Sequence, residues 1–252
     1  LPKSLDKTKY DVRVVIPDYT CIPQKYRSRF SYFGSFYMDL GDLGNFYVGI
    51  MTCEFDGVRY YYIDNEHFFH GEKLYSDILW DIQKFSFFSK AVLSMLPFIG
   101  FRPDVIHCHD WQTALIPVFL HEMFQDNPFF RGIRTVMTIH NLKFQGVWDI
   151  QTMRRFTGLP GHVFVLGRME FKKDANMLKG GLVYADRITT VSETYANEIR
   201  MPYYGEGLDG LLNAKADTLS GILNGIDYEM YNPATDPLIA ANYSAKDFKK
   251  GK

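Results

Sequence analysis

The sequence predicts an α/β fold, with a mostly parallel sheet and helices on both of its faces. Short apolar runs rich in β-branched residues, such as residues 11–17 and 134–139, alternate with segments of helical periodicity. Strands that alternate with helices in this way are typical of buried parallel sheets. The chain has 252 residues, of which 46% are hydrophobic, which suits one large domain or two small ones.

Strands are predicted from short β-branched or alternating runs bounded by turn residues. They are expected at residues 11–17, 46–55, 58–63, 104–108, 134–139, 186–191 and 218–223. Asp56-Gly57, between the second and third of these, is the strongest short-range signal for a hairpin. The tail beyond the last strand contains Pro233 and Pro237 and is interpreted as a linker.

Helices are predicted where apolar residues recur at helical spacing. They are expected at residues 77–96, 111–124, 149–156, 174–184 and 193–199, with the end of one at residues 1–7 and the start of another at Asp209. Proline removes a helical hydrogen bond, so the first long helix should stop before Pro97. Gly180-Gly181 should interrupt its helix, and Ser192 is the expected N-cap of the next one.

Composition narrows the possible classes of function. The net charge of −1 gives no support for binding nucleic acid or an anionic membrane surface. Charged residues interrupt every apolar stretch before the roughly 18 residues that a transmembrane helix needs. Cys21, Cys53 and Cys108 have no metal-binding spacing and favour a reducing cytosol. Because the chain begins at Leu1 rather than Met, we expect it to be truncated or processed.

Polar side chains follow two consecutive strands of the predicted sheet. His107-Cys108-His109-Asp110-Trp111 closes one strand, and His140-Asn141 closes the next. In open parallel sheets, ligands bind in the crevice beyond the carboxyl ends of the strands. A glycine-rich dinucleotide fingerprint does not follow the first strand, which argues against a nicotinamide cofactor. The sequence therefore predicts a site for a polar ligand, with a sugar as the favoured choice.

Several motifs resemble those of glycosyltransferase family 5, the family of bacterial glycogen synthases and plant starch synthases. The similar stretches are residues 11–17, 107–115, 138–148, 184–192, 204–212 and 223–227. Two of them read Tyr-Gly-Glu-Gly-Leu-Asp-Gly-Leu-Leu (204–212) and Leu-Asn-Gly-Ile-Asp (223–227). Together the stretches span nearly the whole chain, and their combination is more specific than any one motif.

The resemblance implies the N-terminal half of a GT-B architecture, in which two Rossmann-like domains face each other across a cleft. Residues 1–223 would form the acceptor-side domain, and residues 224–252 a hinge or linker towards a C-terminal nucleotide-sugar domain. The implied reaction is retaining transfer of glucose from ADP-glucose or UDP-glucose to the non-reducing end of an α-1,4-glucan. No cofactor and no catalytic metal are implied, and the location would be the cytoplasm, or the plastid in a plant. The chain alone is expected to be inactive.

Asp110 and His140 are the residues to which the resemblance assigns a catalytic role. A carboxylate at position 110 could accept hydrogen bonds from sugar hydroxyls and favour positive charge at the anomeric carbon. Capping of the next helix is the alternative for Asp110. Turn formation is the alternative for His140-Asn141. His107 and His109 share a strand face and could also be metal ligands, but no further His or Cys completes a shell.

A further set of residues is predicted to bind substrate. The set comprises Tyr75, His109, Trp111, Asn141, Gln145, Gly146 and Asn224. Trp111 could instead pack behind Asp110, and Gly146 could be needed for positive φ or close backbone approach. Two other functions stay open: a glucan-binding domain without catalysis, and another GT-B transferase of the sucrose-synthase type.

Overall fold

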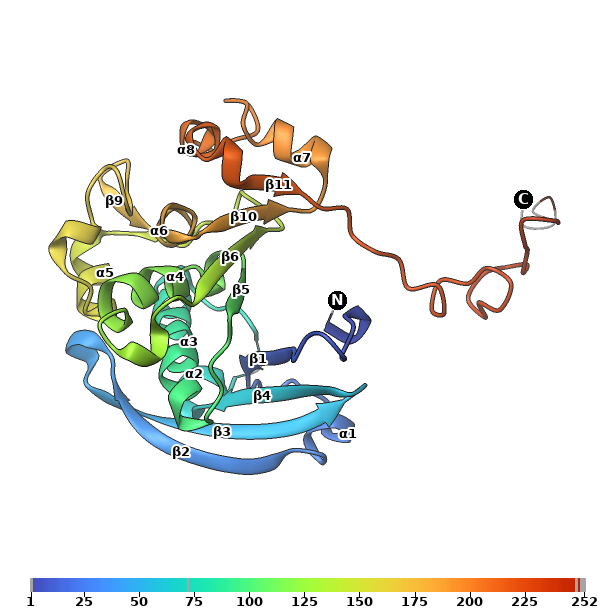
Figure 1. Ribbon diagram of the computed structural model, residues 1–252, viewed down its shortest axis with the longest axis horizontal. Coiled ribbons are helices and arrows are strands. Elements are labelled where there is room, and N and C mark those ends of the chain that lie inside the picture. Colours follow the sequence, from blue (N-terminus) through green and yellow to red (C-terminus); the bar gives the residue numbers. More distant parts are fainter. Residues whose placement is uncertain (1, 72, 248, 250–252) are drawn as a thin grey trace. The chain divides into compact units, whose positions relative to one another are not determined.

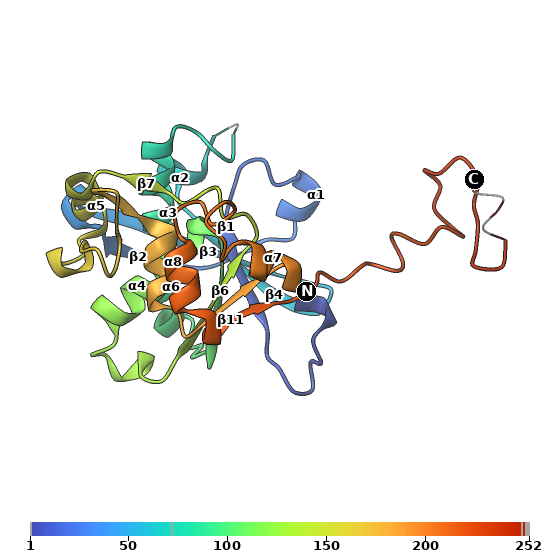
Figure 2. The same ribbon diagram turned by 90° about the horizontal axis from the view of Figure 1, so that it is seen from above.

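The computed structural model describes residues 2–71, 73–247 and 249. By its contacts the chain divides into two compact units, Leu1–Ile222 and Leu223–Lys252. All α-helices and strands of the described residues lie in the first unit, which has an α/β fold. Its two larger sheets, called sheet A and sheet B below, can be followed in Figures 1 and 2.

Sheet A is mixed and contains the predicted hairpin. Its strands are, in spatial order, β1 (Arg13–Pro17), β4 (Val58–Asp64), β3 (Asn45–Phe55) and β2 (Ser31–Asp39). β1 runs parallel to β4, and the other pairs are antiparallel. Asp56 and Gly57 have φ of 50° and 67°, the left-handed values that a tight hairpin turn requires. The sequence reading missed β2, an edge strand that is mostly exposed or half-buried and has irregular register near Gly34.

Sheet B is fully parallel, as the alternation of strands and helices predicts. Its strands are, in spatial order, β11 (Leu219–Gly221), β10 (Arg187–Thr190), β6 (Arg134–Ile139) and β5 (Val105–His109). The strand at residues 13–17 pairs within sheet A instead of joining sheet B, which corrects the expectation of one main sheet. A small antiparallel sheet C joins β7 (Val147–Trp148), β9 (Asp174–Asn176) and β8 (Glu170–Phe171).

The helices range from single turns to one long buried helix. The α-helices are α1 (Gln24–Arg27), α2 (Glu66–Phe69), α3 (Ile78–Phe98), α4 (Leu115–Phe119), α5 (Ile150–Thr157), α6 (Met177–Tyr184), α7 (Glu193–Glu198) and α8 (Asp209–Ala214). Short 3₁₀ turns occupy Pro2–Ser4, Gly41–Leu43, Trp111–Thr113, Pro128–Phe130, Gly161–Val163 and Ala216–Thr218, and a π-turn occupies Leu120–Phe124. Within the described residues, no helix combines the length and the apolar character that crossing a membrane requires.

Helix α3 continues past the proline that was expected to stop it. Its N-cap, Asp77, accepts a hydrogen bond from the Trp80 N–H, as helix caps do. Pro97 lies in the last turn, where it removes one helical hydrogen bond without breaking the helix. The helix ends at Phe98, and Gly100 follows it with a φ of 63°, which permits the closing bond from the Phe101 N–H to the Leu96 carbonyl. In Figure 1, α3 lies between sheet A and α4.

Three other expected helices differ in detail. The stretch 111–124 divides into 3₁₀, α and π turns, and Pro117 within α4 lacks a donor for the preceding turn. Residues 174–176 form β9, so α6 starts only after Asn176. Pro2–Ser4 form a single 3₁₀ turn rather than the end of an α-helix, and Leu1 lies outside the described residues.

Gly180 and Gly181 do not interrupt α6, contrary to expectation. They let the helix pack closely, because a Cβ atom at Gly181 would lie 2.8 Å from Ala114. A Cβ atom at Gly180 would lie 2.6 Å from Met169. The predicted cap of α7 is confirmed, since the Ser192 hydroxyl accepts a hydrogen bond of 2.9 Å from the Tyr195 N–H.

Candidate active site

Asp110 and His140 meet at the carboxyl ends of β5 and β6. Oδ1 of Asp110 accepts hydrogen bonds from the backbone N–H of His140 at 2.7 Å and of Asn141 at 3.4 Å. The Asp110 side chain makes no capping bond to the turn Trp111–Thr113 that follows it. The carboxylate therefore connects two strand ends and does not cap its own helix, which was the alternative reading.

The backbone of Asp110 is held in an unusual conformation. Its φ is 53° and its ψ is −172°, a region that residues other than glycine rarely occupy. The neighbouring contacts hold it there: the Asp110 N–H donates to the Thr138 carbonyl at 2.9 Å, and the Thr113 hydroxyl accepts from the His109 N–H at 2.6 Å. Such strain costs about 1–3 kcal/mol and clusters at functional sites.

Three histidine rings gather beside this carboxylate. The rings of His107 and His109 lie 4.3 Å apart between centroids, and Nδ1 of His109 is 3.0 Å from Nε2 of His140. Nε2 of His107 is 2.6 Å from the Thr138 hydroxyl, which lies 2.6 Å from the Thr189 hydroxyl. This hydrogen-bonded row crosses β5, β6 and β10 on one face of sheet B. Within the described residues, no three His, Cys, Asp or Glu side chains are grouped so that they could hold a metal.

Crowding favours the neutral form of the His107 and His109 imidazoles. Loss of water around the His109 ring, followed by the charges of His107 and His140, lowers the pKa of His109 to about 4. Loss of water and then the charge of His140 lower the pKa of His107. A neutral ring can accept a hydrogen bond at one nitrogen and donate at the other, which suits recognition of sugar hydroxyls.

The loop at residues 141–146 continues from His140 and packs over Trp111. Gly146 has a φ of 63°, and a Cβ atom there would overlap the Trp111 ring, so both reasons predicted for a glycine are confirmed. Trp111 is buried and lies edge-on to Phe85 at 5.1 Å between centroids. Asn141 is exposed, and its side-chain oxygen accepts the Lys143 N–H at 3.1 Å, a turn-forming contact.

Tyr75 contacts the segment after Asp110 through Gln112, which was not among the predicted site residues. Its hydroxyl accepts a hydrogen bond of 3.2 Å from Gln112, two residues after Asp110, and Tyr75 itself is 55% exposed. Thr138 and Tyr195 were missed as well. The Tyr195 hydroxyl accepts the Leu142 N–H at 3.2 Å. Their roles depend on strand register and helix placement, for which a single sequence carries little signal.

Gln145 and Trp148 are less exposed than His109 and His140. Gln145 is 8% exposed, and its amide is engaged by Asn176 and by backbone carbonyls. Trp148 is half-buried in β7 of sheet C. Asn224 is exposed and belongs to the second compact unit. A substrate-binding role for Gln145 and Asn224 stays a prediction.

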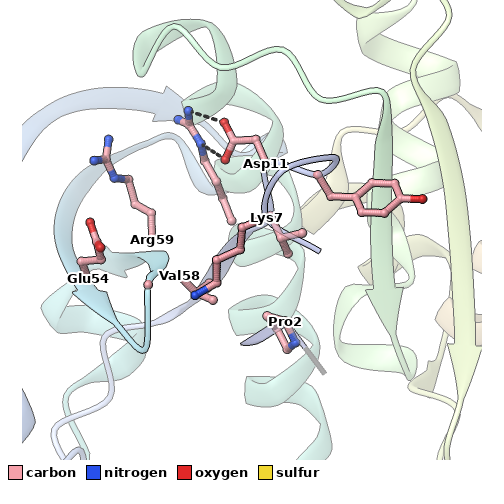
Figure 3. Close-up of a pocket in the computed structure, with 10 residues that line it drawn as sticks. Pro2, Lys7, Asp11, Glu54, Val58 and Arg59 are labelled. Carbon is pink, nitrogen blue, oxygen red and sulfur yellow. Dashed lines mark hydrogen bonds and ion pairs between the residues drawn. The ribbon is translucent and has the colours of Figure 1, made fainter. Parts of the chain in front are cut away.

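A separate cavity of about 320 Å³ lies at the amino ends of β1 and β4 in sheet A (Figure 3). Lys7, Arg13, Glu54 and Arg59 line it near the amino ends of β1 and β4. Asp11 also lines it and pairs with Arg13 through both carboxylate oxygens, at 3.2 and 2.9 Å. Its cations and carboxylates are mixed, and none of the predicted site residues contributes to it.

Comparison with known proteins identifies a matching family and similar proteins. The family model of the starch synthase catalytic domain matches residues 1–214. The glycogen synthase of Lachnospira eligens is 58% identical over 252 residues, which is 100% of this chain and 52% of that protein. The glycogen synthase of Desulforamulus reducens is 45% identical over 250 residues, which is 99% of this chain and 52% of that protein.

A solved structure agrees with both relatives. The catalytic domain of starch synthase IV from Arabidopsis thaliana, bound to ADP and acarbose, superposes with a TM-score of 0.87 and 30% identity. The match covers 99% of this chain and 51% of that one, so the chain spans about half the length of these relatives. The chain belongs to the starch synthase catalytic-domain family of glycosyltransferases.

Proposed function

We propose that this chain is the acceptor-side half of a glycogen or starch synthase. The whole enzyme would transfer glucose from a nucleotide sugar to the non-reducing end of an α-1,4-glucan, with retention at the anomeric carbon. The observation that carries this proposal is the bond of 2.7 Å between the Asp110 carboxylate and the His140 N–H, at the strand ends where α/β proteins bind ligands. The family membership of the chain supports the same reaction.

The roles of Asp110 and His140 follow from this geometry. Oδ1 of Asp110 holds the backbone after β6, and within the described residues no hydrogen bond engages Oδ2. Oδ2 can therefore accept a sugar hydroxyl, and the charge of the carboxylate favours the oxocarbenium character of the transition state. The exposed ring of His140 has Nε2 directed to His109, which leaves Nδ1 for a second hydroxyl.

The donor would be ADP-glucose. The Arabidopsis starch synthase is described with ADP and acarbose bound, which supports an adenosine diphosphate sugar. Relatives are about twice as long as this chain, so we assign the diphosphate contacts to the remainder of the enzyme. We expect no nucleic-acid or membrane partner, because the net charge is −1. A cytoplasmic location is proposed from the three free cysteines.

Binding of maltoheptaose to this chain, measured by calorimetry, tests the acceptor site. Asp110→Ala and His140→Ala should each weaken binding by about tenfold or more, the loss of a charge-assisted hydrogen bond. Asp186→Ala is the matched control, because the Asp186 carboxylate also accepts a backbone N–H, from Thr135 at 2.8 Å, at the amino end of β6. Equal affinities in Asp110→Ala and Asp186→Ala would contradict the proposal.

Catalysis is tested separately. This chain alone should transfer no glucose from labelled ADP-glucose to maltoheptaose, because the proposed diphosphate contacts lie outside it. Product formed by the pure chain would overturn that assignment.

A further inference from the structure

Two buried amide side chains join loops that are far apart in the sequence. Gln145 follows β6, and Asn176 precedes α6; they are 8% and 0% exposed. Oε1 of Gln145 accepts a hydrogen bond of 2.5 Å from Nδ2 of Asn176. Nε2 of Gln145 donates to the carbonyls of Leu142 at 3.0 Å and of Glu206 at 3.2 Å. The loop after His140 is thereby tied to the loop at residues 205–207.

The backbone of Lys179 determines which amide group donates and which accepts in these hydrogen bonds. The backbone N–H of Lys179 can only donate, and it donates to Oδ1 of Asn176 at 2.8 Å. Nδ2 of Asn176 must then face Gln145, so Gln145 presents its oxygen to Asn176 and its nitrogen to the two carbonyls. A buried amide with an unmade bond is costly, so each member of the series holds the next in place.

The far end of this series is the motif Tyr204-Gly205-Glu206-Gly207-Leu208. Glu206 has a φ of 48° and Gly207 a φ of 81°, so the loop needs support from its surroundings to keep this shape. The carbonyl of Glu206 receives that support from Gln145. Leu208 is buried, and its N–H donates to the Gly205 carbonyl at 2.7 Å.

We propose that Asn176 and Gln145 are positioning residues that set the loop after His140 and the loop at 205–207 as one unit. Asp110 fixes the start of the first loop, and Gln145 fixes its other end. A loop held at both ends loses less conformational freedom on binding a glucan, which strengthens binding. The tether is a property of this chain alone, and only its effect on glucan affinity rests on the proposed function.

The tether is tested with Asn176→Asp and Asn176→Ser. Both keep an oxygen that can accept the Lys179 N–H, and both remove the Nδ2 amide group that donates to Gln145. The expected result is amide hydrogen exchange at Leu142 and Leu208 that is about tenfold faster, the loss of roughly one hydrogen bond. Maltoheptaose should also bind about tenfold more weakly, at unchanged stoichiometry.

Asn65 offers a matched control for a purely structural amide. It is 4% exposed, its Oδ1 accepts the Phe68 N–H at 3.1 Å as the cap of α2, and its Nδ2 donates to the Tyr47 carbonyl at 2.7 Å. Asn65→Asp and Asn65→Ser should lower the unfolding temperature similarly but leave exchange at Leu142 and Leu208 unchanged.

Each outcome decides a different point. If exchange at these two amides rises equally in the Asn65 and Asn176 variants, or in neither, the tether is refuted. If the unaltered chain binds no maltoheptaose, the acceptor site of the proposed function fails, and the exchange comparison still decides the tether. Should Asn176→Asp not fold, Asn176→Ser carries the same comparison without an added charge.

Discussion

The Asp110 carboxylate and the His140 backbone N–H are 2.7 Å apart, although 30 residues separate them in the sequence. Asp110 follows β5 and His140 follows β6, two parallel neighbours in sheet B. One carboxylate oxygen thus shapes the backbone of the neighbouring loop while the other remains available to a ligand. Four predictions follow from this site and from the packing behind it.

The strained backbone of Asp110 predicts an order of stability between two variants. Asp110→Ala and Asp110→Gly both lose the bond to His140, but only glycine adopts φ 53° with ψ −172° without strain. Asp110→Gly should therefore be more stable to urea than Asp110→Ala by about 1 kcal/mol. At Asp104, which is exposed and has negative φ, the alanine variant should be at least as stable as the glycine variant. If the glycine variant were the more stable one at both Asp110 and Asp104, backbone strain at Asp110 would be refuted.

Gly146→Ala should strongly destabilise the chain. The new Cβ atom would meet the Trp111 ring and lie 3.1 Å from the Met177 sulfur, at a φ of 63°. We expect a loss of roughly 2–4 kcal/mol in the free energy of unfolding, from overpacking together with backbone strain. Gly210→Ala in α8 is the control: nothing lies within 4 Å of its Cβ position, so it should be neutral or stabilising. Similar values for both variants would contradict this packing.

His109 should titrate well below an ordinary histidine. Its pKa of about 4 in the folded protein lies below the usual 6.5, so the unfolded chain binds a proton that the folded chain does not. The stability contributed by the neutral ring is therefore complete above pH 6.5 and is lost as the pH falls towards 4. An NMR titration of the imidazole signals measures this pKa directly. His140→Ala should raise it, and an unchanged value would show that the two rings do not interact.

Glu122 should stabilise the packing around the π-turn Leu120–Phe124, in which it lies. Its side chain is 7% exposed and accepts hydrogen bonds from Tyr184 at 2.6 Å, His162 at 2.6 Å and Arg168 at 2.8 Å. Burial alone raises the pKa of Glu122, but the hydrogen bonds of Tyr184 and His162 and the nearby positive charges outweigh it and lower the pKa. Glu122→Gln should cost about 1–3 kcal/mol at pH 7 by chemical denaturation.

The pH dependence supplies the second arm of this test. Because the pKa of Glu122 is depressed, its contribution is present above the usual value of 4.5 and disappears as the pH falls through the folded-state pKa. The difference between Glu122→Gln and the unaltered chain should therefore shrink in acid. Exposed Glu54→Gln should be nearly neutral at both pH values. A constant difference for Glu122→Gln would mean that its charge does not matter.

Local features of the sequence were enough for much of the secondary structure. The hairpin at Asp56-Gly57, the cap at Ser192 and the strands that end at His109 and Ile139 all depend on residues within a few positions of one another. Backbone preference and side-chain periodicity act over that range, so a single chain reveals them. The helix that was expected to stop before Pro97 shows the limit, because it includes Pro97 and ends at Phe98.

The sequence by itself determined the alternation of strands and helices and the polar residues at two strand ends. Only the tertiary structure decided that β1 pairs in sheet A, that the Asp110 carboxylate turns to His140 rather than to its own helix, and that Gln145 points inward. Each of these outcomes depends on register and burial between segments tens of residues apart. A buried polar group takes whichever partner the packed fold brings within hydrogen-bond distance, and the order of residues along the chain does not specify that partner.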